Sequence, residues 1–170
     1  MRQLYFTALA ALCSCVSFYL EAIGSNRAYV LTSDQKLWVI DQDDPTATAN
    51  LTLAYPSTGQ LVCCPGTDTI YVAETSGTGP VLEVFNASSF TSTATFITFL
   101  GTSIAAIATD PANVLYIVSV APSTSNVYIS SYDPTTLTKR DFAGFTNSIF
   151  SGVFGLSSDG TRAVIGTFNT

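Results

Sequence analysis

The chain has 170 residues, a formal net charge of −6 at neutral pH and only 11% charged residues. This length suits one domain with one hydrophobic core. The acidic balance, with Lys139 and Arg140 as the one adjacent basic pair, argues against nucleic acid and anionic membrane surfaces as partners. The sequence contains no histidine, which excludes a Ser-His-Asp triad or a Cys-His pair as catalytic machinery.

Residues 1–24 have the pattern of a secretory signal peptide. Met1 and Arg2 give a short basic start, and an apolar run follows from Leu4 to Leu12. Small residues fit two cleavage positions, after Ser17 and after Gly24. We therefore expect residues 25–170 to form the folded domain and to be secreted.

Two alternatives to cleavage remain open. The uncharged run from Leu4 to Leu20 reaches the lower length limit of a membrane-spanning helix, so an uncleaved segment would anchor the domain at the cell surface. Cys15 lies in a pattern that loosely resembles a bacterial lipid-anchor motif.

The rest of the chain predicts an all-β domain. Short runs rich in Val, Ile, Tyr, Phe and Thr alternate with clusters of Gly, Pro, Ser and Asp, and no helical periodicity interrupts them. The expected strands are Ala28 to Leu31, Lys36 to Ile40, Ala49 to Leu53, Gln60 to Cys64, Thr69 to Ala73, Val81 to Phe85, Thr93 to Phe99, Ser103 to Ala108, Val114 to Val118, Asn126 to Ser131, Leu137 to Phe142, Ile149 to Leu156 and Arg162 to Thr167.

An internal repeat organises these strands. The stretches Leu37 to Leu51, Leu82 to Phe96 and Ile129 to Phe142 align on one another. Asp41, Asn86 and Asp133 share one column of the alignment, and Thr46, Thr91 and Thr138 share a second column five residues later. A repeat of this length is typical of arrays in which each unit buries its apolar face against the next.

Each unit contains four strands. An apolar inner strand is followed by a strand with a tyrosine column (Tyr29, Tyr71 and Tyr116), an alternating strand that ends in Asp or Asn, and a Thr-rich outer strand. The hairpin between the second and third strands lengthens from copy to copy. We expect recognition to occur at such loops, in particular Glu74 to Pro80 and Ala121 to Asn126.

This pattern resembles the YVTN-type and WD-like β-propeller repeats of the lactonase-like propeller superfamily. The resemblance covers residues 27–168, and it rests on Tyr71-Val72, Leu82 to Asn86, Thr109-Asp110-Pro111 and Ser158-Asp159-Gly160. It implies a partial β-propeller of about three four-stranded antiparallel blades plus the start of a further blade.

A propeller ring needs at least four blades to close. We therefore expect this chain either to be the N-terminal piece of a longer protein or to close a ring with the blades of another chain. An unpaired strand edge would also favour self-association.

Two adjacent cysteines, Cys63 and Cys64, belong to the expected domain. A vicinal disulfide between them would be strained, because adjacent Cα atoms lie closer than a relaxed bridge requires. The alternative is that both are free thiols buried in an apolar strand. Asn50 and Asn86 each begin an N-glycosylation triplet, Asn50-Leu51-Thr52 and Asn86-Ala87-Ser88.

No constellation of catalytic or cofactor-binding residues is visible. Asp68, Asp110, Asn113 and Asp159 are explained by tight turns, and the group Asp41, Asp43 and Asp44 lacks the glycine turn and distal glutamate of a calcium loop. Trp38 and Tyr128 are expected to pack between blades, with a surface ligand anchor as the alternative.

We therefore expect no cofactor and no metal. The sequence favours a secreted or cell-surface module that binds a protein or glycan, and we do not expect it to be an enzyme. The alternative is a lactonase-like or cyclase-like propeller enzyme whose active-site residues lie in blades outside this chain.

Overall fold

The computed structural model describes residues 21–23, 27–41, 43–44, 46, 48–98, 103–121, 124–133, 135–157 and 161–169. It contains three four-stranded antiparallel sheets and one two-stranded sheet. The first sheet consists of β1 (Glu21–Ile23), β2 (Arg27–Thr32), β3 (Lys36–Asp41) and β4 (Thr48–Thr52), and the second of β5 (Ser57–Cys64), β6 (Thr69–Ser76), β7 (Gly79–Asn86) and β8 (Thr91–Thr98). The third sheet consists of β9 (Ser103–Thr109), β10 (Leu115–Ala121), β11 (Asn126–Tyr132) and β12 (Lys139–Phe145), and the last of β13 (Ser148–Leu156) and β14 (Ala163–Asn169).

Every strand expected from the sequence is present, and the four-strand unit is confirmed. A single 3-10 turn, Pro65–Thr67, connects β5 to β6. No helix among the described residues is long and apolar enough to cross a membrane.

Strand β1 was not predicted from the sequence. It lies inside residues 1–24, which have the pattern of a signal peptide. Its three residues pair with β2, with Glu21 opposite Tyr29 and Ile23 opposite Arg27. A three-residue strand is too short to give a periodic signal in the sequence. Cleavage after Ser17 would keep this strand, and cleavage after Gly24 would remove it.

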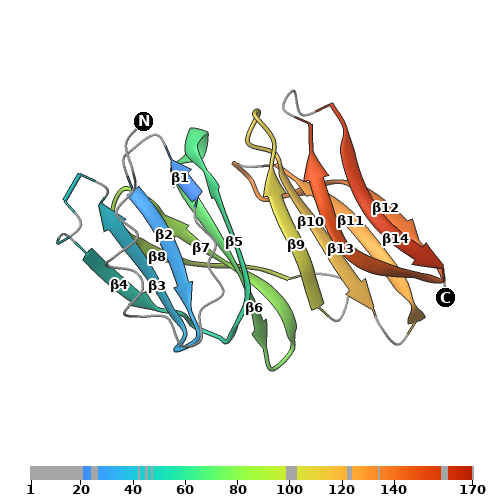
Figure 1. Ribbon diagram of the computed structural model, residues 1–170, viewed down its shortest axis with the longest axis horizontal. Coiled ribbons are helices and arrows are strands. Elements are labelled where there is room, and N and C mark those ends of the chain that lie inside the picture. The colour runs from blue at the N-terminus through green and yellow to red at the C-terminus, as the bar shows by residue number, and fades with distance from the viewer. Residues whose placement is uncertain are drawn as a thin grey trace.

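Figure 1 shows the strands of the first two sheets in one half of the molecule and those of the last two in the other half. The first strand of each sheet lies next to the first strand of the following one: β5 contacts both β1 and β9, and β9 also contacts β13. The connections run in one direction from sheet to sheet. This is the arrangement expected for consecutive blades of a partial propeller.

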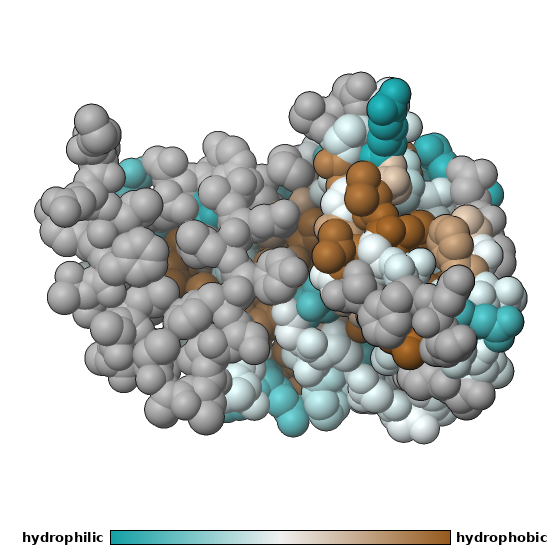
Figure 2. Space-filling view, turned by 45° about the vertical axis from the view of Figure 1, so that its right-hand side comes forward, coloured by the Kyte–Doolittle hydropathy of each residue, from teal (hydrophilic) through white to brown (hydrophobic). Residues whose placement is uncertain are grey.

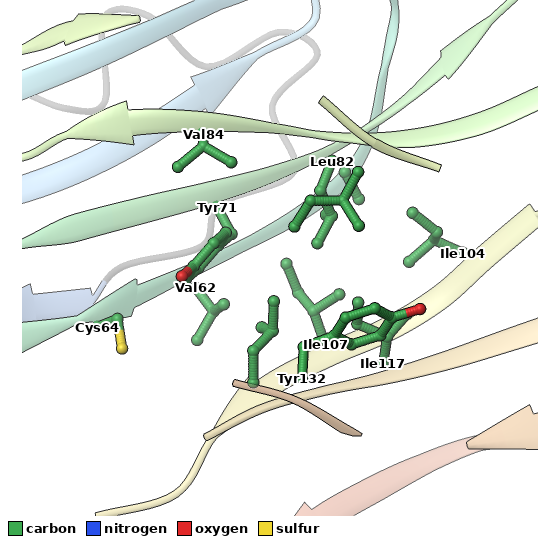
Figure 3. Close-up of a cluster of buried hydrophobic side chains, with 12 residues drawn as sticks. Val62, Cys64, Tyr71, Leu82, Val84, Ile104, Ile107, Ile117 and Tyr132 are labelled. Carbon is green, nitrogen blue, oxygen red and sulfur yellow. The ribbon is translucent and has the colours of Figure 1, made fainter. Parts of the chain in front are cut away.

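The second sheet is buried on both faces, and alternation along its strands divides its side chains between two cores. Leu61, Val72 and Phe85 join a cluster with the first sheet, whereas Val62, Tyr71 and Leu82 join a cluster with the third. Figure 3 shows this second cluster, in which Tyr71 and Leu82 lie opposite Ile107, Ile117 and Tyr132. Near-continuous apolar runs in β5, β6 and β7 are thus explained, because both faces of these strands are covered.

The repeated Asp/Asn column initiates the turn before each outer strand. Asp41 Oδ1 accepts the backbone N–H groups of residues 43 and 44, Asn86 Oδ1 accepts that of Ser89, and Asp133 Oδ1 accepts those of Thr135 and Thr136. A second side-chain bond then links the third and fifth residues after the column in all three copies: Asp44 to Thr46, Ser89 to Thr91 and Thr136 to Thr138. The most visible repeat in the sequence is therefore a turn motif and not a ligand site.

The tyrosine column behaves differently from blade to blade. Tyr29 and Tyr71 are both fully buried, but the Tyr29 hydroxyl donates to the carbonyl of Ala87 at 3.3 Å, whereas the Tyr71 hydroxyl has no hydrogen-bond partner. Burial raises the pKa of Tyr71 to about 12.

This contrast predicts opposite effects of the same substitution. Tyr71→Phe should raise the free energy of unfolding by about 1 kcal/mol, because it removes a buried polar group that is unpaired. Tyr29→Phe should lower it by about 1 kcal/mol through the lost hydrogen bond. Urea denaturation of both variants tests the pair, and an equal loss in both would contradict it.

The last sheet exposes apolar side chains on the side of the molecule shown in Figure 2. Val164 occupies the tyrosine column of the repeat, and it is 62% exposed. In the first two sheets this column faces the following sheet. Large hydrophobic side chains on neighbouring strands are also exposed, namely Phe145, Ile149 and Val153.

Candidate functional site

Turns gather at two ends of the sheets, because successive antiparallel strands reverse direction. One end, here called the Asp-rich end, carries the described turn residues 43–44, 46, 65–68, 87–90, 110–114, 133, 135–138, 157 and 161–162. The opposite end, here called the Tyr55 end, carries the turns within residues 33–35, 53–56, 77–78, 124–125 and 146–147.

At the Asp-rich end, the predicted turn roles of three polar residues are seen directly. Asp68 Oδ2 accepts Asn86 Nδ2 and the N–H of Ser88, and Asp110 Oδ1 accepts the N–H of Val114 at 2.9 Å. Asn113 Oδ1 accepts the N–H of Gly66 at 3.1 Å and so joins the second and third sheets. Asp68 and Asn113 both have positive φ, as tight reversals require. Asp159 lies outside the described residues.

The carboxylates of Asp41 and Asp44 are likewise occupied by their own turn. Asp44 Oδ1 accepts both the N–H and the hydroxyl of Thr46, at 3.1 and 2.6 Å. Within the described residues no three His, Cys, Asp or Glu side chains come together in a group that could hold a metal ion. This end is therefore explained by turn chemistry.

At the Tyr55 end, one of the two predicted recognition loops is much shorter than expected. The segment from Glu74 to Pro80 is mostly strand, because β6 and β7 stay paired up to Ser76 and Gly79. Gly79, with φ of +131°, closes a hairpin whose loop is only residues 77 and 78. Between Ala121 and Asn126 the structure describes residues 124 and 125, where the Ser125 carbonyl accepts the N–H of Ser148 at 2.7 Å.

The connection from the first sheet to the second, residues 53–56, is held by several backbone hydrogen bonds. Tyr55 is 37% exposed there. The backbone on both sides of Tyr55 is hydrogen-bonded. Leu53 N–H donates to the Gln35 carbonyl, and the Pro56 carbonyl accepts the N–H of Thr75, both at 2.9 Å. Two buried carboxyl groups complete the anchorage.

These carboxyls belong to Glu74 and Glu83, which are 0% and 3% exposed. Glu74 Oε2 accepts the N–H of Tyr55 at 3.0 Å, and Glu83 Oε2 accepts the N–H of Ala54 at 3.1 Å. Burial, followed by the hydrogen bond and the charge of Glu83, raises the pKa of Glu74 to about 9. Neither carboxyl is open to a substrate, so the pair supports the turn and has no access for catalysis.

This pair of buried carboxyls was not predicted from the sequence. A signal was nevertheless available, because glutamate is rarely buried without a partner and both residues interrupt apolar strands. Glu83 lies between Leu82 and Val84, and Glu74 follows Val72-Ala73. Alternation alone places both side chains on the same face as Val72 and Phe85.

Charge divides the two ends sharply. The exposed charged residues described at the Tyr55 end are Asp34 and Lys36, which form an ion pair at 3.4 Å. The Asp-rich end carries the remaining turn carboxylates and basic groups, including Asp43, Asp133 and Arg140. The Tyr55 end is thus close to neutral and presents an aromatic ring among hydroxyl and amide groups.

Cys63 and Cys64 are both buried. Alternation along β5 directs Cys63 into the cluster with the first sheet and Cys64 into the cluster with the third. The two side chains therefore point to opposite faces of the sheet.

Trp38 lies on the face of the first sheet opposite Leu37 and Val39, which face the second sheet. In the described structure it does not pack between two sheets, and Lys36 Nζ lies 5.9 Å from the centre of its ring. Tyr128 is half-buried, and its hydroxyl accepts a hydrogen bond from Asn126 Nδ2 at 3.1 Å.

The two N-glycosylation triplets occupy different environments. Asn50 is exposed on β4, directly opposite Trp38. The Asn86 side chain is instead engaged at both ends, since Nδ2 donates to Asp68 and Oδ1 accepts from Ser89.

No protein-family model and no curated protein sequence matches this chain. Solved structures do resemble it. Hydrazine synthase from Kuenenia stuttgartiensis superposes with a TM-score of 0.70 at 12% identity, over 84% of this chain and 40% of the other. A chain of the mitotic checkpoint complex gives 0.64 at 14% identity, over 83% and 42%, and apo AztD from Citrobacter koseri gives 0.55 at 13% identity, over 73% and 32%.

These neighbours are β-propeller proteins of varied function. Identities this low show the fold alone, and the chain spans less than half the length of each of them. With three four-stranded blades and two strands of a further one, the protein is a partial β-propeller.

Proposed function

We propose that the chain is a secreted binding module whose recognition surface is the Tyr55 end. The observation that carries this proposal is an exposed aromatic ring on a connection whose backbone is held by two buried carboxyls. A ring carried on a backbone that is already held in place requires less ordering on binding. Aromatic residues of this kind contribute disproportionately to binding energy.

The chemistry of the surface favours a neutral, hydroxyl-rich ligand such as a glycan. The one described ion pair at this end, Asp34 with Lys36, is internally neutralised. Gln35, Thr78 and Thr124 are exposed on turns of the same end and supply hydroxyl and amide groups. A strongly charged ligand would find no complementary field there.

A printed array of neutral glycans tests the proposal directly. The full chain, secreted from eukaryotic cells, should bind members of the array, and Tyr55→Ala should weaken that binding at least tenfold. Tyr55→Phe should keep most of it, because the ring remains. Thr135→Ala, at the Asp-rich end, is the matched control and should bind as the unaltered chain does. Equal binding by Tyr55→Ala and the control would contradict the proposal.

If the chain is secreted from eukaryotic cells, we also expect Asn50 to be glycosylated. Its exposed side chain leaves room for an attached sugar, whereas a sugar on Asn86 would break the Asp68 contact and the turn. Asn50→Gln should therefore remove a mass of one N-glycan from the secreted protein, as read by intact mass spectrometry. Asn86→Gln should leave the glycan mass unchanged, and a loss of mass in this variant would contradict the assignment.

A further inference from the structure

Two buried carboxyl groups lie side by side beneath the Tyr55 connection. Glu83 pairs across the sheet with Val72, two residues before Glu74, so the two side chains are diagonal neighbours on one face. Long side chains in this relation reach one another. Two ionised carboxylates this close and this buried would repel strongly, and each would lose its hydration.

Three of the four carboxyl oxygens of Glu74 and Glu83 accept a hydrogen bond, and one does not. Glu83 Oε2 accepts from Ala54, Glu83 Oε1 accepts from Ser92 Oγ at 2.6 Å, and Glu74 Oε2 accepts from Tyr55. The remaining oxygen, Glu74 Oε1, is buried and accepts nothing. A proton on this oxygen would make it a donor toward the neighbouring carboxyl of Glu83, whose side chain also contributes to the raised pKa of Glu74. One proton shared by the two carboxyls would therefore give the last buried oxygen, Glu74 Oε1, a hydrogen-bond partner.

We infer that Glu74 and Glu83 share a single proton and that this proton locks the Tyr55 connection, so that alkaline solution releases it. When the proton passes to hydroxide, two buried negative charges face each other, and separation of the side chains withdraws the acceptors of Ala54 and Tyr55. The lock itself is a property of the fold, and its role as regulation of binding rests on the proposed function.

No other described group competes for this proton. Ser57 pairs with Glu74 across β5, and Ser92 contacts Glu83 from β8, but neither is titratable in this range. The Tyr55 ring is partly exposed, and Asp34 and Lys36 on the neighbouring turn are paired with each other. Burial and Glu83 are the leading causes of the raised pKa of Glu74.

Carbon NMR of the full chain with labelled glutamate side chains tests the inference without any ligand. The sequence contains three glutamates, Glu21, Glu74 and Glu83, so three carboxyl signals are expected, and the Glu74→Gln and Glu83→Gln variants assign them. The Glu74 signal should titrate with a midpoint near 9, and the amide signals of Ala54 and Tyr55 should move with the same midpoint. In Glu74→Gln those amide signals should not move between pH 6 and 10, because the amide is a permanent donor to Glu83.

Titration of Glu74 near its ordinary pKa would overturn the shared proton. Titration near 9 with stationary amide signals would overturn the lock. Both results are read on the unliganded chain, so they are independent of the glycan array. If the lock is present and the array is negative, the proposed function fails and the inference about the fold stands.

Discussion

Replacing Phe85 with alanine should lower the free energy of unfolding by about 4 kcal/mol, the largest loss we expect from one substitution. Phe85 is fully buried, and it packs in the cluster that joins the first and second sheets. Removing the ring deletes apolar contact and leaves a cavity whose walls are strands of two different blades. Because a typical domain is stable by only about 5–15 kcal/mol, this loss is a large fraction of the total.

Phe145→Ala is the matched control for this experiment. Phe145 is on β12 and is 37% exposed, so the same change of side chain should cost about 1 kcal/mol or less. Urea denaturation monitored by far-ultraviolet circular dichroism measures both variants. A Phe85→Ala loss no larger than that of Phe145→Ala would show that the two sheets do not stack through this ring.

Stability should also fall as the pH rises from about 5 to 9, because of Glu74. Its pKa in the folded state is about 9, against an ordinary value of 4.5, so the folded chain holds the proton more tightly than the unfolded chain does. The resulting stabilisation is complete below about pH 4.5, decreases as the pH rises, and is lost once the pH passes 9. Since one pKa unit corresponds to about 1.36 kcal/mol, the effect is on the order of 5 kcal/mol.

Glu74→Gln separates this contribution from all others. Every other titratable side chain is present in both proteins, so the difference between the two pH profiles reports the proton that Glu74 and Glu83 share. Denaturation midpoints between pH 5 and 9.5 should decline for the unaltered chain and change little for the variant. Parallel profiles would contradict the assignment. Asp133 does not interfere, because hydrogen bonds from Thr136 and Thr135 lower its pKa to about 2.

The amino-acid sequence alone determined the blade architecture of this protein. Strand alternation, as in β7, depends on residues close together in the sequence. The turn bonds of Asp41, Asn86 and Asp133 are equally local. Patterns of this kind can therefore be recognised in the sequence itself. The same locality explains why the roles of Asp68, Asp110 and Asn113 as turn residues could be predicted. The all-β blade fold could therefore be predicted from the sequence.

Only the tertiary structure decided which residues form the candidate site. Tyr55, Glu74 and Glu83 lie on three different segments, and their relation depends on the register between β6 and β7 and on the path of the connection above them. The expected loop from Glu74 to Pro80 became strand for the same reason, since strand pairing continues as long as a partner is in register. A contact between distant segments depends on how the sheets pair and stack, and no local pattern encodes that geometry.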